Sequence, residues 1–211
     1  MQRTTGRKRP RVTFCATGNF AHIPLHAAYS PSEGASDYLV ASYTPTLGVL
    51  LNAQKTFAPI RRDSVNVLLA AVPVPFRGTH LSETVAEIAL LKNQLPERSF
   101  KVVPVDTSQS KSASCKDVLD HLPAANILHL ACHGSHNMFS PLDSGFIMHD
   151  KMLKITQLME LNLPQAFFTF LSACETARVD HNQPDQAVHM AATMLFTGFK
   201  SVIGTMWCEI I

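Results

Sequence analysis

The chain has 211 residues, of which 46% are hydrophobic and 16% charged, and its formal net charge is +2 at pH 7. This composition excludes an intrinsically disordered chain, and the small net charge favours neither nucleic acid nor an anionic membrane as a partner. No apolar run approaches the roughly 18 residues that cross a bilayer, and no signal-peptide pattern follows the N-terminus, so the sequence predicts an intracellular, cytoplasmic protein.

The cysteines are odd in number, widely spaced and without a Cys-x-x-Cys pair: Cys15, Cys115, Cys132, Cys174 and Cys208. This usage argues against a disulfide framework and against a zinc site, and it is compatible with a reducing compartment. The sequence also lacks the glycine-rich motifs that bind dinucleotides or nucleoside triphosphates. We therefore expect no metal and no other cofactor.

The length fits one domain with a substantial core. Residues 1–11 are basic and are predicted to form a disordered tail to which we assign no function, and residues 12–211 are predicted to form a single domain. Near its start, strands are expected at 12–15 and 38–43, around a loop rich in Ser, Gly and Pro. Residues 45–47 (Pro-Thr-Leu) are then expected to open a helix that runs to about residue 54, with Pro45 at or near its first turn.

From residue 65 onward, strand and helix patterns alternate. Apolar runs predict strands at 65–72, 101–105, 127–132, 166–173 and 200–206. Helical spacing of apolar residues predicts helices at 81–95, 115–122, 155–160 and 185–196, the last ended by Gly198. This alternation is typical of an α/β fold and predicts a doubly wound, mostly parallel sheet with helices on both faces. Pro104 places the second strand at an edge of the sheet.

Two of these apolar runs end in reactive side chains. The run at 127–132 leads to His133 and Gly134, and the run at 166–173 leads to Cys174. Neighbouring parallel strands lie about 4.8 Å apart, and ligands of open α/β sheets bind at the carboxyl ends of the strands. The pattern therefore predicts an imidazole and a thiol that meet at this edge.

Such a pair suits nucleophilic catalysis. A cysteine with a pKa of about 8.5 is only a few per cent thiolate at neutral pH, and a nearby histidine base raises that fraction. The backbone N–H groups of Gly134 and Cys174 are candidates for an oxyanion hole. The competing interpretation is that His133 and Cys174 merely end their strands, without a catalytic role.

Other candidates fit less well. Cys132 adjoins His133, but successive strand residues point to opposite faces, so Cys132 is expected in the core. His129 is expected to be a hydrogen-bonded interior group. His136 and His149 fall on the loop side of the sheet, where a place in a cleft and simple solvation both remain open.

These residues carry a resemblance to a known family. His133-Gly134 after an apolar strand, followed by residues 171–177 (LSACETA), resembles the CHAT domain, a family related to caspases and separases that is often associated with TPR repeats. Three further segments resemble the same family and extend the similarity over most of the chain: 22–28, 42–47 and 201–207.

The resemblance implies a caspase-like α/β fold and a cysteine endopeptidase with a His–Cys dyad. It implies His133 as the general base and Cys174 as the nucleophile. It also implies a peptide or protein substrate, and control by a sensor or TPR region that this chain lacks. Members usually continue beyond the tryptophan that Trp207 matches, and in the separase branch that continuation helps to bind a basic P1 side chain. The domain is therefore expected to be incomplete at its C-terminal end.

Two alternatives to the endopeptidase remain open. The chain could be a non-catalytic regulatory or interaction module, or an inactive fragment of a larger CHAT protein. It could also be another hydrolase or an acyltransferase that uses the same dyad, because one fold hosts many chemistries.

Overall fold

The computed structural model describes residues 8–61, 64–95, 100–102, 112–137, 139–173 and 189–205. The chain divides into two compact units, and each is described by itself. The first comprises residues 1–52 and 179–187, and the second comprises residues 53–178 and 188–211. Cys174 and Cys208 lie outside the described residues, and so does the Cys174 amide proposed for the oxyanion hole.

The first unit is built around a parallel pair of strands, β1 (Arg11–Phe14) and β4 (Val40–Tyr43). Between them the chain forms short elements, which are η1 (Gly18–His22), η2 (Leu25–Ala27), β2 (Tyr29–Ser30), β3 (Glu33–Gly34) and α1 (Ala35–Tyr38). The strand predicted to begin at residue 38 begins two residues later. The reason is a helical turn, since the Asp37 carboxylate accepts a hydrogen bond from the Gly34 N–H at 2.8 Å.

The predicted helix near residue 47 is α2 (Leu47–Lys55). Its first turn is capped by Thr46, whose hydroxyl oxygen accepts a hydrogen bond from the Val49 N–H at 3.2 Å. This helix leads from the first unit into the second.

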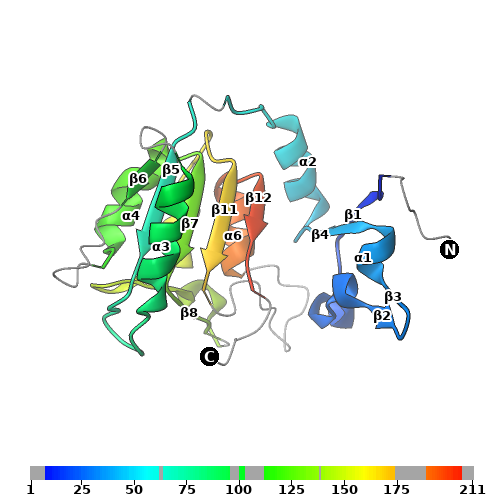
Figure 1. The fold of residues 1–211 in the computed structure, drawn as a ribbon, viewed down its shortest axis with the longest axis horizontal. Helices are drawn as coiled ribbons and strands as arrows, with labels where there is room; N and C mark the ends of the chain where they lie inside the picture. Colours follow the sequence, from blue (N-terminus) through cyan, green and yellow to red (C-terminus); the bar gives the residue numbers. More distant parts are fainter. Residues whose placement is uncertain are drawn as a thin grey trace. The chain divides into compact units, whose positions relative to one another are not determined.

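A five-stranded parallel sheet forms the centre of the second unit (Figure 1). Its strands are β5 (Val67–Ala71), β6 (Phe100–Val102), β7 (Ile127–Ala131), β11 (Phe168–Ser172) and β12 (Ser201–Ile203). Their order is β12-β11-β7-β5-β6, so β6 lies at an edge, as expected from Pro104 in the predicted run at 101–105. The predicted α/β class with a parallel sheet is confirmed, and a doubly wound arrangement of the complete domain stays a prediction.

Helices cover both faces of this sheet (Figure 1). On one face, α3 (Glu83–Gln94) buries Ile88 against Val67, Leu69 and Ala71 of β5. On the other face, Leu68, Leu128 and Leu130 pack with residues of α4 (Cys115–His121), α5 (Ile155–Met159) and α6 (Met190–Thr197). Full burial of each such leucine contributes about 1.5–3 kcal/mol.

A predicted cap ends α6. Gly198 has a φ of +127°, and a Cβ atom at this position would lie 2.5 Å from the Leu163 carbonyl oxygen. A residue without a side chain is therefore required here. The helix begins at Met190, and the predicted start at residues 185–188 lies outside the described residues.

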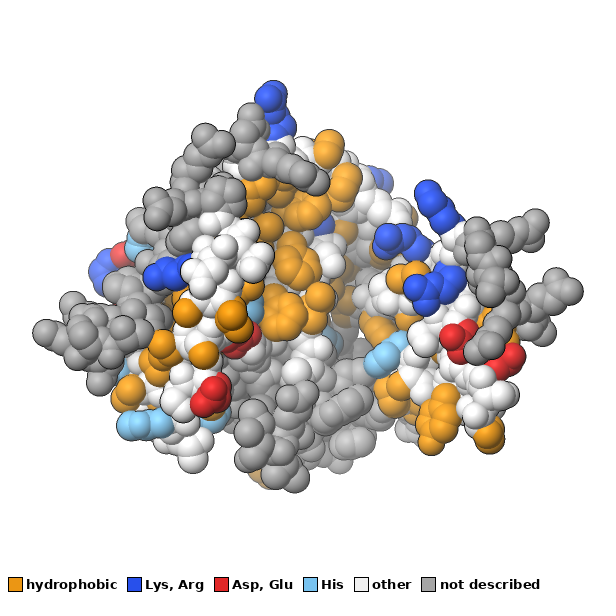
Figure 2. Space-filling model, in the orientation of Figure 1, with side chains coloured by type: hydrophobic (Ala, Val, Ile, Leu, Met, Phe, Trp, Pro, Cys, Tyr) orange, Lys and Arg blue, Asp and Glu red, His pale blue; other side chains and the backbone are white. Residues whose placement is uncertain are grey.

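One face of the sheet carries partly exposed apolar side chains near β12. Phe168 and Phe170 of β11 pair in register with Ser201 and Ile203 of β12, and the Ile203 side chain is 49% exposed. Figure 2 shows hydrophobic side chains gathered in the middle of the visible face. Within the described ranges, no helix is both long enough and apolar enough to cross a membrane.

A second sheet follows directly after β7. It is antiparallel and contains β8 (His133–Ser135), β9 (Gly145–Ile147) and β10 (Met152–Lys154), in the order β10-β9-β8. Two short helical segments, η4 (Leu122–Ala124) and η5 (Pro141–Asp143), complete the described elements.

Candidate active site

The carboxyl ends of three strands lie level with one another. In the register of the sheet, Ala71 of β5 pairs with Ala131 of β7, which pairs with Ser172 of β11. The strand order reverses between β5 and β7, and ligands of open α/β sheets bind outside the carboxyl ends at such a point. The predicted site residues follow these strand ends, so the fold offers a suitable position for a site.

His133 lies immediately beyond this edge. The chain bends at Cys132, and the half-buried His133 is the first residue of β8. The Cys132 N–H still bonds to the Ser172 carbonyl at 3.2 Å, so β7 and β11 stay in register up to the bend. The bend therefore releases His133 from the buried parallel sheet and places it at the rim.

The imidazole of His133 is oriented by a backbone group. Its Nε2 atom lies 2.8 Å from the Thr79 carbonyl oxygen and 3.4 Å from the Thr79 hydroxyl oxygen. A carbonyl oxygen only accepts hydrogen bonds, so Nε2 carries the proton in this arrangement. In the neutral ring, Nδ1 is then left as the basic nitrogen. The contact with Thr79 thus defines the tautomer of the neutral His133 ring and leaves Nδ1 as the nitrogen with a free lone pair.

A glycine in the loop after β5 makes room for this ring. Gly78 has a φ of +96°, which L side chains rarely adopt. A Cβ atom at position 78 would lie 3.2 Å from Cδ2 and 3.4 Å from Nε2 of His133. The imidazole therefore packs directly against the backbone of the loop that also supplies the Thr79 carbonyl.

Hydrogen bonds to the second sheet hold this loop in place. The Phe76 N–H donates to the Met148 carbonyl at 3.0 Å, and Arg77 donates to the Ser135 hydroxyl at 3.2 Å. The exposed His149 has Nδ1 2.9 Å from the Val74 carbonyl oxygen, which assigns the proton to that nitrogen. His149 thus fixes the loop that orients His133.

Gly134 lies on β8, which is an edge strand of the second sheet among the described strands. In the β9·β10 ladder, Met148 N–H donates to Lys151 and Ile155 N–H donates to Ser144. Antiparallel hydrogen bonds alternate from residue to residue, so the backbone groups of Gly145 and Ile147 point to the other side, toward β8. Their partners are Ser135 and His133, which leaves the Gly134 N–H pointing away from β9. This direction suits the predicted oxyanion donor.

A polar cluster joins α3 to the two strands of the site. Nε2 of His129 lies 2.9 Å from one carboxylate oxygen of Glu87, and the Ser172 hydroxyl donates to the other at 3.2 Å. The His129 ring also stacks on Phe170, with the ring centroids 5.2 Å apart. The hydrogen bond from His129 lowers the pKa of the Glu87 carboxyl, against the opposite effect of partial burial. His129 is therefore a partnered interior group, as predicted.

The structure places the other candidate thiols in separate surroundings. Cys132 is 2% exposed and belongs to the core cluster on the α4 side of the sheet, which confirms the prediction for this residue. Cys115 is also buried, and burial, assisted by the nearby Asp150 carboxylate, raises the pKa of its thiol to about 11. Cys15 belongs to the first unit and is partly exposed.

Sequence reasoning missed Thr79, Gly78 and Glu87. Thr79 acts through a main-chain carbonyl, which every residue type possesses, so its identity carried no signal. Gly78 could have been noticed, because a glycine shortly after the end of a core strand often allows a close backbone approach. Glu87 is 42 positions before His129, and only the fold reveals that the two side chains meet.

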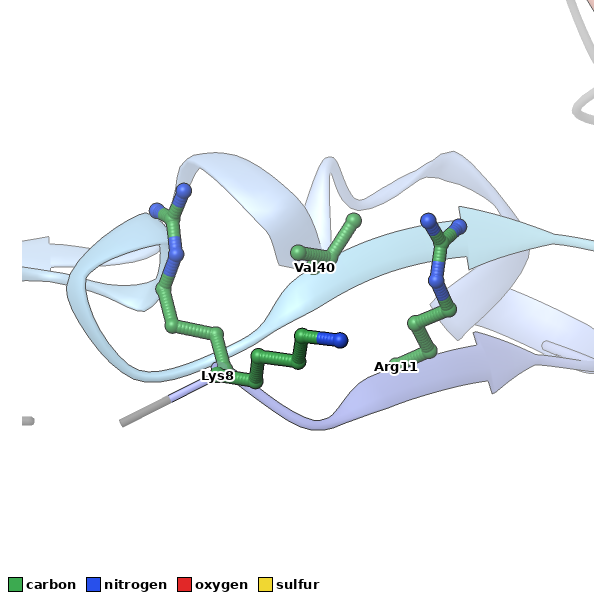
Figure 3. Close-up of a pocket in the computed structure, with 4 residues that line it drawn as sticks. Lys8, Arg11 and Val40 are labelled. Atoms are coloured by element: carbon green, nitrogen blue, oxygen red, sulfur yellow. The ribbon is translucent and has the colours of Figure 1, made fainter. Parts of the chain in front are cut away.

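A pocket in the first unit is lined by Lys8, Arg9, Arg11 and Val40 (Figure 3). The Arg9 guanidinium also donates to the Ser36 carbonyl. This described lining offers cations and one apolar side chain but no thiol, imidazole or carboxylate. It therefore does not provide the nucleophile and base that the sequence predicted.

Comparison with protein-family models gives a match that spans nearly the whole chain. The model of the CHAT domain family matches residues 1–208 of the chain. A search of curated proteins found no match to this sequence. The family match covers both predicted catalytic positions and both units of the fold.

Proposed function

The chain belongs to the CHAT domain family, a caspase-like family of cysteine peptidases, and from this premise we propose that it is a cysteine endopeptidase. In this proposal Cys174 is the nucleophile and His133 is the general base. The observation that carries it is the orientation of the His133 imidazole by the Thr79 carbonyl at the carboxyl edge of the parallel sheet.

The register of the sheet supports the pairing of these two residues. The last paired positions of β7 and β11 are Ala131 and Ser172. His133 and Cys174 each follow two positions later, and Ala173 already lies at the end of the sheet as a 7% exposed residue. Both residues therefore follow the carboxyl ends of neighbouring strands, which supports a meeting of the two side chains at this edge.

The proposed reaction uses His133 twice. Nδ1 accepts the thiol proton of Cys174, and the sulfur attacks the carbonyl carbon of the scissile peptide bond. The N–H groups of Gly134 and Cys174 stabilise the oxyanion that forms. The protonated imidazole then gives its proton to the leaving amine, which leaves a thioester. Water, deprotonated by the same nitrogen, hydrolyses the thioester and regenerates the thiol. Such acid–base participation contributes about 10² to 10⁴ in rate.

The substrate in this proposal is a protein or peptide. Family resemblance motivates a preference for a basic P1 residue and control by a sensor or TPR-containing partner. No metal or organic cofactor enters the proposed reaction. The P1 preference and the regulatory partner are independent of the dyad, so a test that contradicts either of them leaves the His133–Cys174 proposal intact.

Turnover of a peptide library tests the proposal. The library contains basic, acidic and apolar P1 residues and is incubated with the wild type, Cys174→Ala and Cys15→Ala. We expect cleavage after basic residues by the wild type and the Cys15→Ala control, and none by Cys174→Ala. Equal cleavage by the wild type and Cys174→Ala would contradict the proposal. Turnover of esters with peptides untouched would indicate another acyl-transfer reaction, and no turnover of either would favour a regulatory module.

A further inference from the structure

Beyond the last paired residues of β11 and β12, a side-chain hydroxyl forms a hydrogen bond between the two chain segments. The last paired residues of these strands are Phe170 and Ile203. Two positions beyond Ile203, the hydroxyl of the half-buried Thr205 donates to the carbonyl of Ala173 at 2.7 Å. Ala173 is the residue directly before Cys174, so this bond holds the peptide unit that leads into the proposed nucleophile.

The direction of that carbonyl follows the pattern of the strand. The Phe167 carbonyl of the β11 segment accepts the N–H groups of Lys200 and Ser201, on the β12 side. The Ser172 carbonyl accepts the Cys132 N–H, on the β7 side. Carbonyls of successive residues in a strand point to opposite neighbours, and the bond from Thr205 keeps the Ala173 carbonyl on the β12 side.

A planar trans peptide directs its N–H opposite to its carbonyl. We propose that Thr205 is a positioning residue: by holding the Ala173 carbonyl toward β12, it directs the following amide toward the His133 side of the sheet. This inference rests on the proposed function, because the amide concerned is the second donor of the proposed oxyanion hole. Thr205 itself makes no contact with substrate in this proposal.

Two substitutions at Thr205 distinguish the effect of its hydroxyl from the effect of its branched shape. Thr205→Val removes the hydroxyl and keeps the branched shape, whereas Thr205→Ser keeps the hydroxyl. Thr169→Val makes the same chemical change on β11, at a 0% exposed hydroxyl that has no hydrogen-bond partner among the described residues. It is therefore a matched control for loss of a threonine hydroxyl.

The contact itself can be measured without activity. In full-length protein labelled with ¹³C-carbonyl alanine and ¹⁵N-cysteine, only the Ala131–Cys132 and Ala173–Cys174 peptide units give carbonyl–amide correlations. A Cys174→Ser sample identifies the second peak by its disappearance. We expect Thr205→Val to move this peak upfield in the carbonyl dimension, Thr205→Ser to restore it, and the Ala131–Cys132 peak to stay in place. An unmoved Ala173–Cys174 peak would overturn the inference.

Kinetics then test the positioning role. Loss of a single oxyanion donor lowers kcat by about 10²–10³, and a misdirected donor should cost at least about tenfold. We expect Thr205→Val to lower kcat in this way with little change in KM, and Thr205→Ser and Thr169→Val to match the wild type. A moved peak with unchanged kcat would overturn the positioning role while leaving the peptidase proposal intact. A wild type without turnover would overturn both, whereas the carbonyl peak would still report the contact.

Discussion

The imidazole of His133 rests against the backbone of Gly78, where a Cβ atom would approach Cδ2 to 3.2 Å. The next residue of the same loop, Thr79, supplies the carbonyl that holds Nε2 at 2.8 Å. One short segment therefore sets both the position and the tautomer of the proposed base. This relationship gives Gly78 two independent constraints, its positive φ and the contact with the ring.

Gly78→Ala should impair both stability and turnover. A side chain at a φ of +96° costs about 1–3 kcal/mol of unfolding free energy, and displacement of the ring should lower kcat between about 10-fold and 100-fold. Chemical denaturation and peptide turnover check these two effects. Gly18→Ala is the control, since Gly18 also has a positive φ but nothing within 4 Å of the added Cβ. Equal turnover by the two variants would show that the ring does not depend on Gly78.

Glu87→Gln should change the pH dependence of stability. The pKa of Glu87 is lowered in the fold, chiefly by its hydrogen bond from His129. Its ionised form therefore stabilises the protein above the unfolded-state pKa of about 4.3, and this stabilisation is lost as the pH falls through the folded-state pKa. Between about pH 5 and pH 3, the wild type should lose more unfolding free energy than Glu87→Gln.

Denaturant titrations at several pH values measure this difference. Glu83→Gln is the matched control, because Glu83 is an exposed glutamate on the same helix. The control should follow the wild type. Parallel curves for the wild type and Glu87→Gln would mean that the contact with His129 does not stabilise the fold.

Cys115 should resist alkylation in the native protein. Burial and the Asp150 carboxylate raise the pKa of its thiol to about 11, so almost none of it is thiolate at pH 8. Brief treatment with iodoacetamide, followed by peptide mass spectrometry, should label Cys15 and leave Cys115 unmodified. In denaturant both should react. Native labelling of Cys115 as fast as that of Cys15 would contradict the burial described for this residue.

The central strands could be predicted because their sequences are uninterrupted and apolar. The predicted runs at 65–72, 127–132 and 166–173 contain β5, β7 and β11, and β12 lies within the run at 200–206. β5 is buried along its whole length and β7 beyond its first residue, and strands buried on both faces leave this pattern in the sequence. The order of strands within the sheet, in contrast, follows from tertiary packing and became known only from the structure.

Less of the site could be predicted. The strand-end pattern placed His133 and Gly134 at the edge of the sheet, but it did not reveal that β8 starts a second, antiparallel sheet. That sheet depends on Gly145, where a Cβ atom would lie 2.2 Å from the Leu153 carbonyl oxygen, and such close approach leaves little trace in hydrophobic periodicity. The pairing of His133 with Cys174 remains a prediction, since residue 174 lies outside the described residues.

In the proposed peptidase, Cys174 is a nucleophile activated by His133. The most direct test is the mass of the intact protein, followed by peptide mapping, after reaction with a peptidyl acyloxymethyl ketone that carries a basic P1 residue. We expect a single adduct on Cys174 in the wild type, no adduct in Cys174→Ala, and labelling slowed by about 10² or more in His133→Gln. An adduct that persists in Cys174→Ala would show that Cys174 is not the nucleophile, and labelling of Cys174 at an equal rate in His133→Gln would show that His133 does not activate it.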